Sequence, residues 1–185
     1  MGKLERVGRI LAASLALLAT VLGCSIQPSI AASCPAAGVV NRAGLAFMDA
    51  ARGGSAAAFS SALARHTDVR GAAIFALGQY RKDLPPARQG EYVRNAQSYM
   101  ARFLLDNARP FRSSRDLIIE SCKGNLVETS LGGRSRMVWR ISGGRVRDVR
   151  VGGVWLAIQL RSKFTGIIRR NQGDIDALLE FLRRR

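Results

Sequence analysis

The side chains that most often carry out chemistry are scarce in this sequence and are scattered along it. The single histidine, His66, and the three cysteines, Cys24, Cys34 and Cys122, are too few for a zinc site of the usual kind. The sequence has no Gly-x-Ser-x-Gly nucleophile elbow, and no glycine-rich phosphate loop follows an expected strand. We therefore expect no catalytic centre, no metal site and no cofactor.

The ionisable residues have patterns that are typical of surface positions. His66 is expected at the solvated C-terminal end of a helix, where the helix dipole favours the charged imidazole. Most carboxylates stand beside arginine or lysine, as in the run RDVR at 147–150. Such neighbours form surface ion pairs far more often than acid/base dyads. The sequence therefore does not favour an enzyme.

The charge is the most unusual feature of the composition. Among 185 residues, 29 are Lys or Arg and 13 are Asp or Glu, which gives a net charge of +16, while 48% of the residues are hydrophobic. The hydrophobic content excludes an intrinsically disordered chain, and the length suits one domain with a core. Taken alone, the charge indicates a polyanionic partner, either nucleic acid or an anionic membrane.

The N-terminal residues have the pattern of an export signal. Three basic residues precede the uncharged run 10–22, which is shorter than the roughly 20 residues that a membrane-spanning helix needs. Small residues follow at 29–33, where a signal peptidase can cut. We predict a signal peptide over 1–32 and an exported domain over 33–185. An uncleaved membrane anchor is the alternative.

Export changes how the cysteines are interpreted. Cys24 follows Gly23 in a partial match to a lipobox, so a lipid anchor at Cys24 is a lesser alternative to cleavage further on. Cleavage before Cys34 leaves Cys34 and Cys122 as an even pair in an oxidising compartment. Either a disulfide between them or two unpaired thiols fits the sequence.

Before residue 110 the apolar residues recur at helical spacing. The pattern predicts helices over 36–52, 56–65, 69–79 and 86–107. Ser55 is suited to cap the second helix, and either Thr67 or Asp68 the third. Pro110 prevents the fourth helix from continuing.

The period changes to two residues over 116–151. Strands are expected over 116–123, 126–131, 134–141 and 145–151, with glycine pairs at 132–133 and 143–144 as hairpin turns and a third pair, Gly152-Gly153, ending the sheet. Helical spacing returns over 154–170 and 174–183. This order predicts an α+β fold, in which N- and C-terminal helices wrap a twisted antiparallel sheet of about four strands.

Bulky apolar residues gather on one face of the third strand and of several helices. They either fill the core or line an apolar cavity between the sheet and the helices. The second interpretation places fourteen residues in that cavity: Phe75, Met100, Phe103, Leu104, Met137, Trp139, Ile141, Val149, Val151, Leu156, Leu160, Phe164, Ile167 and Ile168.

The last third of the chain resembles a known family. Two stretches carry the likeness: DVRVGGVWL at 148–156 and LRSKFTGII at 160–168. They are similar to the periplasmic phospholipid-binding MlaC proteins, also called the toluene-tolerance family, of which one subgroup is associated with hopanoid synthesis. Weaker likeness, including FALGQY at 75–80, extends over residues 39–183. The positions that match the family pattern are Asp148, Gly153, Arg161, Ser162 and Phe164.

The sequence departs from the family pattern at two positions. Trp155 stands where members usually have serine, and Arg147 stands where they usually have an aromatic residue. A tryptophan at 155 is expected to narrow or reshape the cavity, so these departures leave the class of lipid open.

The resemblance implies a fold and a role. The fold is a twisted antiparallel sheet wrapped by helices, with the acyl chains of a phospholipid or related lipid between sheet and helices. The role is that of a periplasmic lipid carrier between an outer-membrane lipoprotein complex and an inner-membrane ABC transporter with an MCE subunit. No cofactor is implied.

The alternative function is an exported, non-enzymatic protein that binds a polyanion or a partner protein through its arginines and has a filled core. Removing residues 1–32, with three basic residues and one acidic residue, leaves a charge of +14, so the excess belongs to the exported domain. With export and the apolar faces taken into account, we expect this charge to meet anionic membrane surfaces and acidic partners rather than nucleic acid.

Overall fold

The structure is a computed structural model that describes residues 34–184. The predicted signal peptide over 1–32, its cleavage site and the lipobox at Cys24 lie outside the described residues. Within residues 34–184, none of the helices combines the length and the apolar character needed to cross a membrane.

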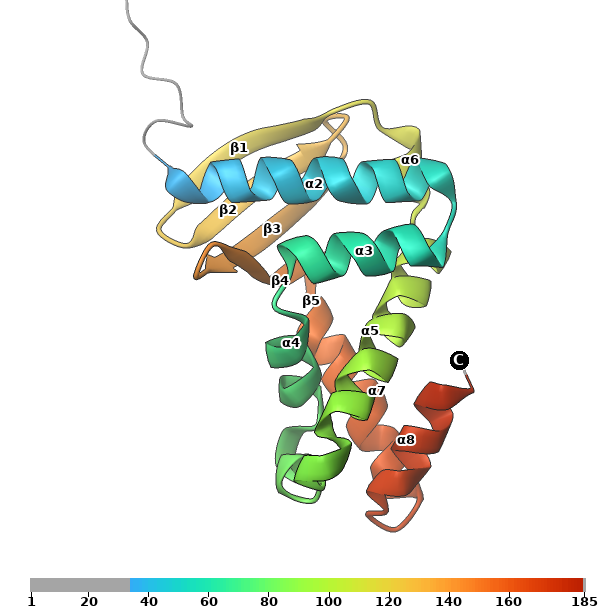
Figure 1. Ribbon diagram of the computed structural model, residues 1–185. Helices are drawn as coiled ribbons and strands as arrows, with labels where there is room; N and C mark the ends of the chain where they lie inside the picture. Colours follow the sequence, from blue (N-terminus) through green and yellow to red (C-terminus); the bar gives the residue numbers. More distant parts are fainter. Residues whose placement is uncertain (1–33, 185) are drawn as a thin grey trace, which may run out of the picture.

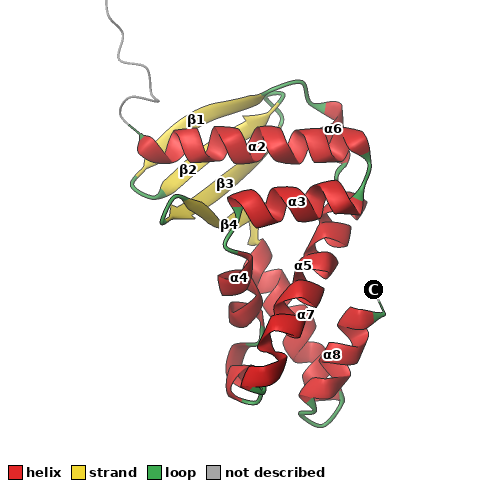
Figure 2. Ribbon diagram, in the orientation of Figure 1, coloured by secondary structure: helices red, strands yellow, loops and turns green. Residues whose placement is uncertain are grey.

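Helices come first along the described chain, then an antiparallel sheet, then two more helices (Figures 1 and 2). The N-terminal helices are α2 (Pro35–Gly53), α3 (Ala56–His66), α4 (Val69–Ala76), the 3₁₀ helices η1 (Gly78–Lys82) and η2 (Pro86–Arg88), α5 (Gln89–Asp106) and α6 (Arg109–Ser113). The strands are β1 (Leu117–Lys123), β2 (Leu126–Leu131), β3 (Ser135–Ser142), β4 (Arg145–Val151) and β5 (Val154–Trp155). The chain ends with α7 (Leu156–Arg170) and α8 (Ile175–Arg183).

The five strands form an open meander in the order β1-β2-β3-β4-β5, with every neighbouring pair antiparallel. In this register Trp139 lies opposite Val127 on β2 and opposite Val149 on β4. Because side chains alternate along a strand, these three share the inner face of the sheet, while Arg136 and Arg140 point to the outer face. The inner face is therefore apolar, while the outer face carries these arginines together with Glu128, which lies opposite Val138.

The helices are arranged in two groups. In the first group, α2 crosses the inner face of the sheet and α3 lies beside it. The second group, formed by α4, α5, α7 and α8, extends away from the sheet (Figure 1). The two groups of helices meet where α3 packs on α5. The second group also contacts the sheet, because α7 packs on β4. The junction therefore brings the inner face of the sheet next to α5 and α7.

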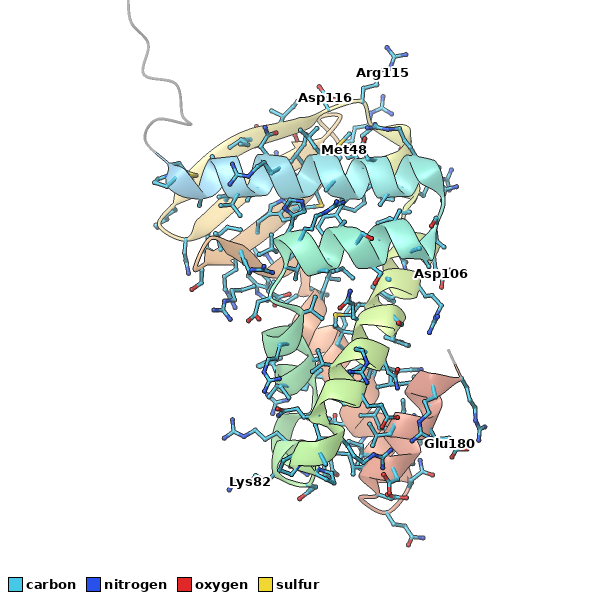
Figure 3. All side chains as sticks on the ribbon, in the orientation of Figure 1. Met48, Lys82, Asp106, Arg115, Asp116 and Glu180 are labelled. Atoms are coloured by element: carbon cyan, nitrogen blue, oxygen red, sulfur yellow. A yellow bond between two sulfur atoms is a disulfide. The ribbon has the colours of Figure 1, made fainter. Side chains whose placement is uncertain are left out.

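One hydrophobic core runs through both groups. It includes Met48 of α2 (labelled in Figure 3), Tyr92 of α5 and Leu179 of α8, each fully buried. Burial raises the pKa of the Tyr92 hydroxyl, which donates a hydrogen bond to the Ala73 carbonyl at 2.6 Å. This bond joins α5 to α4.

A disulfide joins the N-terminal end of α2 to β1. It links Cys34 and Cys122, whose Cα atoms are 6.2 Å apart and which are 88 residues apart in the sequence. Of the two interpretations left open by the sequence, the structure therefore has the bonded pair. A crosslink over so long a loop limits the unfolded chain and so favours the folded state.

Side-chain caps fix the starts of three helices. Ser55 accepts a hydrogen bond from the Ala58 amide at 3.2 Å, and Asp68 accepts one from the Gly71 amide at 3.1 Å. The third helix is α8, in which Asp174 accepts from Asp176. The predicted cap at Ser55 is confirmed, and Asp68 rather than Thr67 caps α4.

Two expected helix boundaries are wrong, and one helix was not expected. The helix predicted over 69–79 ends at Ala76, because Gly78 adopts a left-handed φ of 58° and the chain continues as η1. Helix α5 ends before Pro110, as expected. Pro110 itself lies in the first turn of a further helix, α6, where no hydrogen bond within the helix needs its missing N–H. The helix predicted over 154–170 begins at Leu156.

The reason for this later start is a fifth strand. Gly152 and Gly153 have φ values of 58° and 83°, which suit the tight turn of a hairpin. They do not end the sheet but reverse the chain, so that Val154 and Trp155 pair with β4 as strand β5. The expected four strands therefore become five.

Candidate functional site

The main feature of the interior is an apolar cavity of about 540 Å³ where the sheet meets the helices. Its walls come from the inner face of β2 to β4, from α2 and α3, and from α5, α6 and α7. Most of its lining is apolar, and rings line it from several sides, among them Phe47, Trp139 and Tyr99. A cavity of this size and character suits an apolar ligand.

Polar residues of the lining mark where the cavity opens. Asn107 near the end of α5 and Gln159 and Lys163 on α7 are exposed and also line the cavity. These three residues place an opening between the C-terminal half of α5 and the N-terminal half of α7, and the exposed Arg147 borders the cavity on β4.

Nine of the fourteen residues that the sequence placed in a cavity line this one. They are Met100, Phe103, Leu104, Met137, Trp139, Val149, Val151, Leu156 and Leu160. Trp139 is held in place because its indole N–H donates to the Thr129 hydroxyl at 2.8 Å, and its ring stacks on Phe47 with centroids 6.3 Å apart. Whether any of these residues contacts a ligand stays a prediction.

The other five predicted residues do not line the cavity, which corrects their expected place. Phe75 is 42% exposed on the outside of α4, where the Arg161 guanidinium lies 5.3 Å from its ring. Phe164 is fully buried against the rings of Tyr92 and Tyr99. The remaining three are core residues away from the cavity: Ile141, Ile167 and Ile168.

The sequence analysis missed several lining residues, of which the largest are Phe47 on α2, Phe59 on α3, Tyr99 on α5 and Phe111 on α6. The first three lie on the apolar faces of predicted helices, so helical spacing gives a signal for them. That signal does not show which part of an apolar face borders a void, because this depends on how helices cross. Phe111 follows Pro110, where no helix was expected.

Among the family-motif positions, Asp148 has the clearest structural role. Its half-buried carboxylate on β4 accepts hydrogen bonds from the Val149 amide at 2.8 Å and the Ala157 amide at 3.0 Å. The second bond satisfies a free N–H in the first turn of α7. Burial raises the pKa of Asp148, and these two bonds and the nearby Arg140 oppose that effect. Asp148 therefore fixes the start of the helix that borders the cavity.

Two further motif positions, Gly153 and Arg161, serve the framework around the cavity. Gly153 forms the turn between β4 and β5. Arg161 packs against Gly78, where a Cβ atom would lie only 2.9 Å from its Nε atom. Ser162 is exposed on α7.

The two departures from the family pattern lie in different places. Trp155 does not line the cavity, contrary to the expectation that it would narrow it. Its ring lies 4.2 Å from the Arg140 guanidinium carbon and 5.5 Å from that of Arg150. Arg147 does line the cavity and forms an ion pair with the helix cap Asp68.

His66 differs from its predicted environment. It is the last residue of α3, as expected, but it is partly buried. Burial, together with the charges of Arg65, Arg42 and Arg145, lowers its pKa, which opposes the effect that we expected from the helix dipole. Across residues 34–184, no three or more His, Cys, Asp or Glu side chains are grouped so as to hold a metal ion.

Comparison with known proteins gives the family. The model of the MlaC protein family matches residues 49–184. The chain belongs to the MlaC family. The expectation drawn from the stretches at 148–156 and 160–168 is therefore confirmed.

A solved structure shows the same fold as this MlaC-family chain. It is the phospholipid-binding protein from Ralstonia solanacearum in complex with a phospholipid, which is 17% identical, with a TM-score of 0.65 over 80% of this chain and 95% of that one. No curated protein sequence matches this chain. The structural likeness confirms the expected mixed fold of helices around an antiparallel sheet.

Proposed function

We propose that this protein is a periplasmic lipid carrier that encloses the acyl chains of a phospholipid or related lipid in its apolar cavity. The observation that carries the proposal is the cavity itself, about 540 Å³ with a mostly apolar lining, in a chain of the MlaC family. The solved structure with the same fold holds a phospholipid. The alternative function assumed a filled core, and the cavity counts against it.

The physics of lipid transfer explains why such a cavity is needed. Two acyl chains hold about 30 methylene groups, and exposing each to water costs about 0.8 kcal/mol, so a free lipid in water is unfavourable by about 25 kcal/mol. A carrier that surrounds the chains removes this cost. It needs no catalytic residue, metal or nucleotide for that task.

The rest of the proposed role concerns transport. The carrier moves its lipid between an outer-membrane lipoprotein complex and an inner-membrane ABC transporter with an MCE subunit, and the transporter supplies the energy for direction. Export by a signal peptide over 1–32 belongs to this proposal. Membership of the subgroup associated with hopanoid synthesis is the alternative within this proposal.

Arginines on the outer face of the sheet support an encounter with anionic membranes. Arg136 and Arg140 on β3 are exposed there, and Arg150 on β4 lies beside Trp155. We predict binding to vesicles that contain anionic lipid at low salt and weaker binding as salt rises, because exposed charges are screened. Vesicle sedimentation checks this, and equal binding to neutral vesicles would contradict it.

A pair of substitutions on α7 tests the proposed use of the cavity. Leu160 lines the cavity, whereas Ile158, two residues earlier, is 49% exposed and points away from it. Leu160→Trp places a bulky ring in the space proposed for the acyl chains, so uptake of dioleoyl phosphatidylcholine from vesicles by delipidated protein should fall at least about tenfold. The matched variant Ile158→Trp should take up lipid as the unchanged protein does.

Lipid uptake that is the same in both folded variants would contradict the proposal. Circular dichroism and the urea midpoint establish that each variant is folded, so that loss of uptake is not confused with loss of structure.

A further inference from the structure

A second, smaller hollow adjoins the opening of the apolar cavity. It has a volume of about 200 Å³ and lies between α5, α7 and α8. Three of its lining residues, Tyr99, Phe103 and Lys163, also line the main cavity. A molecule that fills the main cavity and emerges between α5 and α7 therefore enters this hollow.

The hollow differs from the main cavity because its lining is rich in charge. Arg102 and Asp106 on α5 and Lys163 on α7 line it, together with the ring of Phe181 on α8. Two cations and one carboxylate leave one net positive charge. Asp106 lies at the C-terminal end of α5 (Figure 3), so its carboxylate is at one end of the hollow.

Arg102 has an unused donor in this hollow. Its Nε atom is buried, and no residue among 34–184 accepts a hydrogen bond from it. Buried donors are almost always paired, so the unpaired Nε atom shows that no acceptor of the described chain holds this edge of the guanidinium that lines the hollow. Within the described chain neither Arg102 nor Lys163 forms an ion pair with a carboxylate.

The second cation is positioned by an aromatic ring. The Lys163 ammonium lies 5.6 Å from the centre of the Phe181 ring, which holds the charge over the hollow by a cation–π contact. A guanidinium and an ammonium on neighbouring helices are the groups that proteins use to bind phosphate oxygens.

On this geometry we propose that Arg102 and Lys163 form a subsite for the phosphodiester of a glycerophospholipid whose acyl chains occupy the main cavity. The proposal rests on the lipid-carrier function and deepens it by naming the headgroup chemistry. Tyr99 and Phe103 form the shared border, where the glycerol backbone passes from the apolar cavity to the charged hollow. The single negative charge of a phosphodiester matches the net charge of the subsite.

A choice between two lipids with the same chains tests the subsite. Protein expressed from the full chain, purified and delipidated, is incubated with vesicles that contain equal amounts of dioleoyl phosphatidylcholine and dioleoylglycerol, which lacks the phosphate. Wild-type protein should bind the phospholipid at least about tenfold better, because charge-assisted hydrogen bonds are the strong ones. The double variant Arg102→Gln/Lys163→Gln should bind the same total amount of lipid with a preference below about twofold.

A matched control removes a cation elsewhere. Lys82 is exposed in η1 at the far end of the helical group (Figure 3), and Lys82→Gln should keep the wild-type preference. If the double variant does not fold, Arg102→Lys keeps the charge but removes the planar guanidinium with its several donors, and its preference should fall at least about threefold.

Three results would overturn the subsite. They are an unchanged preference in the folded double variant, an unchanged preference in Arg102→Lys when only that variant folds, and equal binding of the two lipids by the wild-type protein, which would leave free phosphate as the only phosphate ligand for these cations. Failure of wild-type protein to bind either lipid would instead contradict the lipid-carrier function itself.

Discussion

At the scale of single residues, the carboxylate of Asp148 is half-buried even though burial disfavours its charge. It is placed where it accepts two backbone hydrogen bonds, one of which belongs to the first turn of α7. The same residue lines the cavity. We infer that the position is used to fix α7 against β4, at some cost in solvation of the charge.

This role predicts opposite effects for two substitutions. Asp148→Ala leaves two amide donors without their acceptor and should lower the free energy of unfolding by about 1–3 kcal/mol. Asp148→Asn keeps an oxygen acceptor and removes the buried charge, so at neutral pH it should be at least as stable as the unchanged protein. Urea unfolding measures both.

The raised pKa of Asp148 also sets the direction of a pH dependence. The folded state holds the proton more tightly than the unfolded state, whose value is near 3.8. The stability of the unchanged protein relative to Asp148→Asn is therefore greatest below that pH and falls as pH rises through the raised folded value. If the unchanged protein became more stable relative to Asp148→Asn as the pH rises through this range, the role of burial would be contradicted.

The residues that line the cavity could be predicted well for the strands and less well for the helices. Alternation along β3 places Met137 and Trp139 on the inner face, and the structure has them there. Phe164 and Ile168 have the same helical spacing as Leu160 but are buried away from the cavity, since the crossing of α7 with α5 and α8 decides which side is core. A single sequence does not contain that crossing in any local pattern.

At the scale of elements, glycines decide where helices and strands end. Gly78 ends α4 with a φ of 58°, and a Cβ atom there would also lie 2.9 Å from the Nε atom of Arg161 on α7. The close approach of α4 and α7 thus depends on the missing side chain. This explains the glycine in the stretch FALGQY at 75–80.

Gly78→Ala should therefore destabilise the protein by about 1–2 kcal/mol, because the left-handed conformation and the contact with Arg161 both disfavour a side chain. Gly90→Ala is the matched control, since Gly90 lies in α5 with an ordinary φ, and it should be neutral or slightly stabilising. The urea midpoints of the two variants measure the difference. Equal midpoints would show that Gly78 is not required for the packing of α4 on α7.

Strand β5 and helix α6 show what local patterns leave out. Two residues, Val154 and Trp155, are too few for alternation to reveal a strand, and five residues are too few for a helical period. Both elements exist because of their neighbours: the glycine turn brings β5 back along β4, and α6 packs on α2.

At the scale of the whole molecule, the fold class, the order of the long elements and the family all follow from the sequence. The change from helical spacing to alternation at residue 116 marks the step from helices to sheet, and the match over residues 49–184 agrees with the family. The cavity follows less directly, because the same apolar faces are compatible with a filled core. Only the way in which the two helix groups meet at the sheet leaves the space open.

The charge of the molecule gains a structural context at this scale. Arginines on the outer face of the sheet lie opposite the apolar inner face, so one sheet separates Arg136 and Arg140 from the cavity. This arrangement suits a carrier that meets anionic membranes with one side and keeps acyl chains on the other.

The central claim is that the cavity carries lipid, and native mass spectrometry of the protein purified from the cell envelope tests it most directly. We expect a main species whose mass exceeds that of the polypeptide by one phospholipid or related lipid, and organic extraction should release that lipid. A protein that carries no lipid when isolated in this way, and that takes up none from vesicles after delipidation, would contradict the account.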